Sequence, residues 1–136
     1  MEPTERELIR ELRTIENQKQ YNLDLKLRVL EHLGGKACVS CGFSDPMALC
    51  VDHIHNDGAR DRKKNSTYTI RKRILSMSPE AARRDYQVLC ANCNQIARQT
   101  YLNKRTQQRI DELETKLGIK DFQYEVENGG LRALVE

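Results

Sequence analysis

The sequence contains no tryptophan and only two phenylalanines, and 38% of its residues are hydrophobic while 32% are charged. A core built from this composition is thin for the length of the chain and benefits from an additional staple. No apolar stretch approaches the roughly 20 residues that a membrane-spanning helix needs. No apolar segment of the signal-peptide kind lies near the N-terminus either. We therefore expect a cytoplasmic protein without a membrane partner.

The length and the cysteine content further restrict the class of protein. With 136 residues the chain corresponds to one ordinary domain, or to a small core with extensions. Its five cysteines, in an intracellular setting, are more often metal ligands than disulfide partners when they occur as Cys-x-x-Cys pairs. A zinc ion is the expected staple.

The net charge of +3 is modest, but the positive charges are concentrated. Residues 59–73 contain one acid, Asp61, and residues 98–109 contain none. This distribution predicts binding to a polyanion, although a solvated basic loop is the alternative interpretation. The candidate nucleic-acid-binding residues are Arg60, Arg62, Lys63, Lys64, Arg71, Lys72, Arg73 and Arg98.

Helices are expected at both ends of the chain and strands near its middle. Leu8, Leu12 and Ile15 lie at helical spacing in a helix over residues 4–33, although residues 21–29 also alternate as a strand does. The C-terminal helix of the same chain, or the matching helix of a second subunit, would cover this stripe, so a homodimer through terminal helices is one interpretation. The other expected elements are strands at 47–51, 86–89 and 122–126, and helices over 69–77, from Ser78-Pro79 onward and from about 90 to 117.

Two Cys-x-x-Cys pairs are the strongest motif. Cys38, Cys41, Cys90 and Cys93 provide four thiolates, which satisfy a closed structural zinc site without an open position for water. The 48 residues between the pairs form a long loop, but the entropic cost of loop closure grows only logarithmically with length. Cys50 lies between Leu49 and Val51 without a second thiol at ligand spacing, so we interpret it as a buried small hydrophobe.

A second polar motif, Asp52-His53-Ile54-His55, follows the predicted strand at 47–51. One carboxylate and two imidazoles within four residues can form a metal site, a catalytic set or a polar surface without joint purpose. On a continuing strand, Asp52 and His53 would point to opposite faces, and a bend after His53 would change this.

Taken together, three segments resemble the HNH endonuclease superfamily, and most closely its zinc-stapled branch, which includes phage recombination endonucleases. The segments are Cys38-Val39-Ser40-Cys41, Val51-Asp52-His53-Ile54-His55-Asn56-Asp57-Gly58 and Leu89-Cys90-Ala91-Asn92-Cys93-Asn94. The resemblance covers residues from about 36 to 100. The basic insertion at residues 59–85 departs from compact members, which have only a short loop there.

The resemblance implies an α+β fold with a small ββα-metal core and a four-cysteine zinc site, flanked by long N- and C-terminal helices. It also implies that Asp52 and Asn94 hold a catalytic Mg²⁺ or Mn²⁺ and that His53 is the general base. His55 would contact phosphate or orient the site. The expected domains are a helical extension at 1–35, the nuclease core at 36–100, and a helix and tail at 101–136.

The function expected from these features is metal-dependent hydrolysis of DNA phosphodiester bonds. A non-catalytic zinc module that binds nucleic acid is the first alternative, and an assembly factor acting through its terminal helices is the second.

Overall fold

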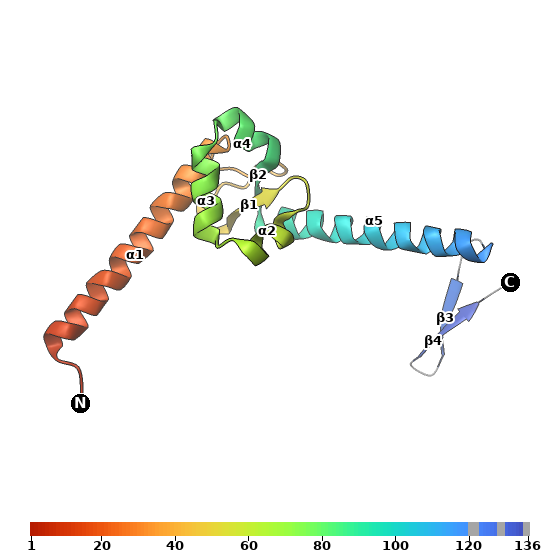
Figure 1. The fold of residues 1–136 in the computed structure, drawn as a ribbon, viewed down its shortest axis with the longest axis horizontal. Coiled ribbons are helices and arrows are strands. Elements are labelled where there is room, and N and C mark those ends of the chain that lie inside the picture. Colours follow the sequence, from red (N-terminus) through yellow and green to blue (C-terminus); the bar gives the residue numbers. More distant parts are fainter. Residues whose placement is uncertain (120–122, 128–129, 135–136) are drawn as a thin grey trace. The chain divides into compact units, whose positions relative to one another are not determined.

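The computed structural model describes residues 1–119, 123–127 and 130–134, the last two ranges as backbone only. It forms two units, Met1–Gln95 and Ile96–Glu136, and each is described by itself. The first unit contains an antiparallel hairpin, four helices and the start of a fifth (Figure 1). The predicted α+β class, with long terminal helices and a four-cysteine cluster, is confirmed. None of the described helices is long and apolar enough to cross a membrane.

Helix α1 (Glu5–His32) begins and ends where its sequence predicts. Thr4 and Glu7 form a capping box, which satisfies free amides of the first turn. At the other end Gly34 has a φ of +115°, and the amide of Gly35 donates to the carbonyl of Leu30. Only the C-terminal half of α1 is anchored in the core, through Leu25, Val29 and Leu30, so the alternative of a strand at 21–29 is wrong.

The hairpin pairs β1 (Leu49–His53) with β2 (Tyr86–Cys90) in antiparallel register. Leu49 lies opposite Cys90 at one end, and His53 lies opposite Tyr86 at the other. Strand β1 begins later than the expected 47–51, because the Asp45 side chain caps a short 3₁₀ helix over Pro46–Ala48. Since side chains alternate along a strand, His53 lies on the face of Leu49, and Asp52 lies on the opposite face.

The hairpin connection contains three helices instead of a tight turn. They are α2 (Gly58–Lys64), α3 (Thr67–Ser76) and α4 (Pro79–Asp85), and the serine N-caps of α3 and α4 accept hydrogen bonds from amides of their first turns. Helix α3 packs along α1 and buries Ile70 and Ile74. The insertion is therefore part of the core and not an appended loop.

The second unit contains most of α5 (Ala91–Leu117) and a hairpin of β3 (Gln123–Glu127) with β4 (Gly130–Leu134). Helix α5 ends at the expected residue, where Gly118 adopts a φ of +69°. The predicted strand at 122–126 corresponds to β3, but Phe122 lies outside the described residues.

Candidate functional site

The four cysteines of the two Cys-x-x-Cys pairs converge at the Leu49–Cys90 end of the hairpin. Their sulfur atoms all lie within 4.8 Å of one another. The Sγ atoms of Cys41 and Cys90 are 3.7 Å apart. Zinc–sulfur bonds of about 2.3 Å in a tetrahedron place neighbouring sulfurs about 3.8 Å apart. The donor set and its spacing therefore fit a structural zinc ion, as the sequence predicts.

Main-chain hydrogen bonds build the cluster from both sides. The amide of Gly42 donates to the carbonyl of Cys38, which closes the first knuckle, and the amide of Val39 donates to the carbonyl of Val88 in β2. At the second pair, the amide of Cys93 donates to Sγ of Cys90 at 3.4 Å. The knuckle before β1 is thus attached to the strand that ends at the second pair.

Within the cluster, the pKa values of two thiols are shifted in opposite directions. Burial raises the pKa of Cys38, but amide hydrogen bonds from Cys90, Cys41 and Ser40 outweigh it and lower that pKa to about 6. For Cys93, the neighbouring thiol of Cys90 is the main cause that raises the pKa to about 12. Four thiols in one small space resist complete ionisation unless a cation compensates their charge.

Cys50 does not belong to the cluster. Its thiol donates to the carbonyl of Leu89 at 3.1 Å and is half-buried. The prediction that Cys50 is not a fifth ligand agrees with this position, but the residue is half-buried and not buried as expected.

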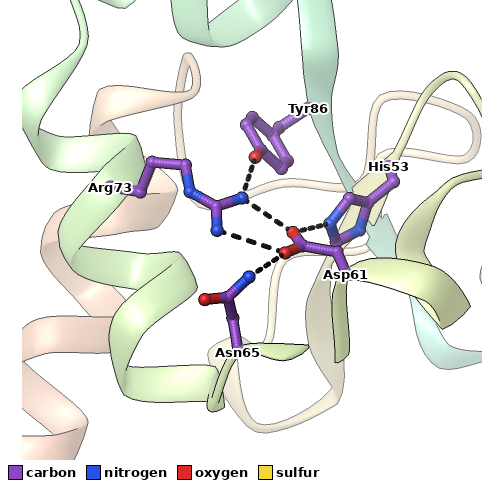
Figure 2. A network of polar contacts seen from close by, with 5 residues as sticks. All are labelled: His53, Asp61, Asn65, Arg73 and Tyr86. Carbon is purple, nitrogen blue, oxygen red and sulfur yellow. Dashed lines mark hydrogen bonds and ion pairs between the residues drawn. The ribbon is translucent and has the colours of Figure 1, made fainter. Parts of the chain in front are cut away.

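His53 lies at the opposite end of the hairpin, buried with an exposed fraction of 7%. Its Nε2 lies 2.9 Å from Oδ2 of Asp61 in α2, and its ring contacts Tyr86 edge-on at a centroid distance of 5.0 Å (Figure 2). Arg73 of α3 donates to both carboxylate oxygens of Asp61, at 2.9 and 3.1 Å, and Asn65 donates to Oδ1 at 2.8 Å. Both carboxylate oxygens of Asp61 therefore accept hydrogen bonds from neighbouring side chains.

These contacts determine the charges in the network. The guanidinium of Arg73 is the main cause that holds the pKa of the Asp61 carboxyl well below its usual range, and His53 and Asn65 add to it. In return, Asp61 and then Tyr86 raise the pKa of Arg73. An ionised carboxylate only accepts hydrogen bonds, so Nε2 of His53 carries a hydrogen and, in the neutral ring, Nδ1 carries the lone pair.

That Nδ1 atom is buried and has no hydrogen-bond partner within the part of the chain that the structure describes. Gly58 covers it: a Cβ at this position would lie 2.8 Å from Nδ1 and 2.9 Å from Nη1 of Arg62. An unpaired buried polar atom costs about 1–3 kcal/mol, so it calls for an explanation.

The residues expected to hold the catalytic cation occupy different elements. Asp52 is half-buried on β1, and its Oδ2 accepts a hydrogen bond of 2.9 Å from Nε2 of Gln87 in β2. Asn94 is half-buried near the start of α5, directly after Cys93. Within residues 1–119, the side chain of Asn94 has no hydrogen-bond partner, and neither does Oδ1 of Asp52. Both groups offer the oxygen donors that hard cations prefer.

His55 lies in the turn after β1, and its Nε2 lies 3.2 Å from Oδ1 of Asp85. Both side chains are exposed. The amide of Ile54 also donates to the carbonyl of Asp85, which fastens this turn to the end of α4. His55 is therefore the solvent-facing imidazole, and His53 is the buried one.

The basic residues differ in their availability. Arg73 is committed to Asp61, whereas Arg62 and Arg71 line a cavity between the helices and β1. The exposed members of the basic set are Arg60, Arg62, Lys63, Lys64, Lys72 and Arg98. Within residues 1–119, Arg73 alone among these candidate nucleic-acid-binding residues forms an ion pair.

Sequence reasoning missed Asp61, Asn65 and Tyr86 as components of the site. Asp61 was detectable only as the single acid in a basic segment, and nothing local indicates its partner His53. Helix α2 was also missed, because Asn56-Asp57-Gly58 has the composition of a turn. Asn56 does adopt a positive φ of +57°, just before the helix begins at Gly58.

Compared with models of protein families, with curated proteins and with solved structures, the chain matches none of them. Any assignment of function therefore rests on the motifs and on the geometry of the site.

Proposed function

We propose that the protein is a zinc-stabilised endonuclease that uses Mg²⁺ or Mn²⁺ to hydrolyse phosphodiester bonds in DNA. The proposal joins the resemblance to HNH endonucleases with one observation, the pairing of a buried imidazole with a carboxylate. Nε2 of His53 is held by Asp61, and Nδ1 is left without a partner among the described residues. Pairing of one ring nitrogen with a carboxylate fixes the tautomer that leaves the other nitrogen free to accept a proton.

In this mechanism His53 takes a proton from water at Nδ1, and the resulting hydroxide attacks phosphorus and displaces the 3′ oxygen. Asp61 keeps the ring oriented and stabilises the imidazolium through its hydrogen bond to Nε2. Arg73 and Asn65 hold Asp61 in place. Because Gly58 covers Nδ1, the first turn of α2 moves when water reaches this atom.

Asp52 and Asn94 are the residues that would hold the hard cation. One carboxylate and one amide oxygen suit Mg²⁺ or Mn²⁺, which retain several positions for water and phosphate oxygens. The cation, when bound, neutralises charge on the phosphate and on the leaving oxygen. The zinc cluster contributes differently, because it fixes the main chain at Cys93, next to Asn94.

The test is cleavage of supercoiled plasmid by zinc-loaded protein with Mg²⁺ or Mn²⁺. The wild type is expected to cut, and His53→Ala and Asn94→Ala are each expected to reduce the rate by at least about 100-fold, the lower range for loss of a general base. Lys116→Gln, an exposed change near the end of α5, serves as the control. Absence of cutting by the wild type, or undiminished cutting by His53→Ala, contradicts the proposal.

A non-catalytic zinc module that binds nucleic acid is the second candidate, and the burial of Nδ1 of His53 favours it. In that case the Asp61 network serves stability alone, and the exposed cations of α2 and α3 bind phosphates. This candidate predicts that nucleic-acid binding survives Asp52→Ala and that no metal-dependent cleavage occurs.

A further inference from the structure

A cavity of about 260 Å³ lies between α1, β1, α2 and α3. Its walls are partly apolar, with Val29, Leu49 and Ile70 among them. Three cationic side chains from three different helices also line it: Lys26 of α1, Arg62 of α2 and Arg71 of α3. No acidic residue of the described chain lines it.

The three cations are unpaired. Among the described side chains, none forms an ion pair or a hydrogen bond with any of them. Burial lowers the pKa of the Arg71 guanidinium, with no anion to compensate the lost hydration. Lys26 and Arg71 are half-buried, and like charges around one space repel one another more strongly where the walls have a low dielectric constant. A bound anion would remove this cost.

Arg73 shows the contrast within the same helix. Its guanidinium is neutralised by the carboxylate of Asp61, so it has little capacity for a further anion. Arg71, two positions away, has no such partner among the described residues, although it is half-buried. The two arginines of α3 thus differ: Arg73 is structural, and Arg71 is available.

We infer that Lys26, Arg62 and Arg71 bind a phosphodiester group of a nucleic-acid backbone in this cavity. The inference rests on the proposed function for its ligand class and adds Lys26, which lies outside the segments that resemble HNH endonucleases. Ligand pockets for drug-sized molecules measure about 300–1,000 Å³, so this cavity suits a phosphate group better than a whole nucleotide. The hydroxyl-bearing Thr67 also lines it and offers one more donor.

The position of the cavity relates it to the candidate catalytic residues. His53 is among its lining residues, and Leu49 and Val51 of the same strand form part of its wall. A backbone phosphate held there would lie beside the strand that carries Asp52 and His53. The cavity would therefore position the nucleic-acid strand relative to the hairpin.

The experiment is fluorescence anisotropy with zinc-loaded full-length protein and a labelled DNA duplex, without added Mg²⁺ or Mn²⁺. Arg71→Gln and Lys26→Gln are each expected to weaken binding about ten-fold and to reduce the slope of log affinity against log salt by about 1. Lys72→Gln is the matched control, because it removes the same charge from the adjacent position of α3 but does not line the cavity. It is expected to weaken binding less than about three-fold.

A second pair of variants separates loss of binding from loss of folding. Arg62 is exposed, so Arg62→Gln leaves the core intact, and it is compared with Lys63→Gln in the same helix. Unchanged thermal melting is required of every variant that is scored. Equal losses in the cavity variants and in the two control variants overturn the inference, because general surface charge would then explain binding.

The source of the phosphate is tested with duplexes that carry a 5′-hydroxyl or a 5′-phosphate. Equal losses for Arg62→Gln on both duplexes support a backbone phosphodiester, whereas a loss confined to the 5′-phosphorylated duplex overturns that assignment. Binding is measured without cleavage, so the two proposals fail separately. A wild type that binds through the cavity but never cuts contradicts the nuclease and leaves the phosphate site standing.

Discussion

The two ends of the β1–β2 hairpin are held by different chemistry. At the Leu49–Cys90 end, four thiols lie within 4.8 Å of one another. At the His53–Tyr86 end, a carboxylate from the inserted helices binds an imidazole, a guanidinium and an amide. At the first end, the spacing of the sulfur atoms suits one metal ion. The second keeps an unsatisfied nitrogen, Nδ1 of His53.

The thiol end has the donor set of a structural metal site, whereas the other end carries an imidazole paired with a carboxylate. A site with four cysteine ligands has no open position, so a bound zinc ion stabilises the fold and does not activate water. The other end holds His53, the general base of the proposed function, together with its carboxylate partner Asp61. Three helices, α2 to α4, connect β1 to β2. Helix α2, the two-residue link after it and α3 supply Asp61, Asn65 and Arg73, respectively.

The largest effect is expected at the thiol end. Cys90→Ser removes one ligand and, because structural zinc contributes on the order of 10 kcal/mol to folding, should abolish cooperative folding of the first unit. Thermal melting by circular dichroism and zinc analysis measure this. Cys50→Ser is the matched control: its hydroxyl can still donate to Leu89, so we expect a loss below about 1 kcal/mol and one zinc per chain. Full zinc content with normal melting in Cys90→Ser would show that the thiols do not hold the metal.

At the imidazole end, Asp61→Asn should cost about 2–3 kcal/mol at pH 7. A neutral amide loses the charge-assisted bonds from Arg73 and His53, although the partial exposure of Arg73 lets water offset part of the loss. The pKa of the Asp61 carboxyl is lower in the folded protein than its ordinary 3.8, so its contribution is complete above that value and declines as the pH falls below it.

Urea denaturation of the wild type and Asp61→Asn at pH 7 and pH 3 measures this contribution. The difference between them should be smaller at pH 3. The control is Asp57→Asn, which removes the same charge from an exposed residue. The side chain of Asp57 makes no capping hydrogen bond to α2, so this change should alter stability by less than about 0.5 kcal/mol. A difference for Asp61→Asn that is independent of pH would mean that the carboxylate is not held by charged partners.

A smaller effect is expected where Gly58 covers Nδ1 of His53. The added methyl of Gly58→Ala would meet the ring at 2.8 Å, and because Asp61 clamps that ring, we expect a net cost of about 1–2 kcal/mol despite the higher helix propensity of alanine. The same substitution in a His53→Ala background should cost less, since the obstructing ring is gone. Equal costs in both backgrounds would show that the start of α2 does not cover the imidazole.

The sequence predicted the thiol end well and the imidazole end only in part. Two Cys-x-x-Cys pairs are typical of a zinc site. The start of α4 was also predictable, because the Ser78 N-cap and Pro79 at the first helical position are local signals. The partner of His53 depends instead on how α2 folds back onto β1, which is a tertiary contact that spans eight residues and has no local signal. The expected roles of Asp52, His53, His55 and Asn94, and the three expected domains, stay predictions.

The most direct test of the central claim is whether Asp52 and Asn94 hold a second, hard cation in addition to the zinc. Electron paramagnetic resonance of zinc-loaded protein titrated with Mn²⁺ reports this ion without any need for catalysis. We expect one Mn²⁺ site in the wild type and in the exposed control Asp45→Asn, and its loss in Asp52→Asn and in Asn94→Ala, with zinc content unchanged. A zinc-loaded wild type without a Mn²⁺ site, or a site that survives both substitutions, would contradict the account.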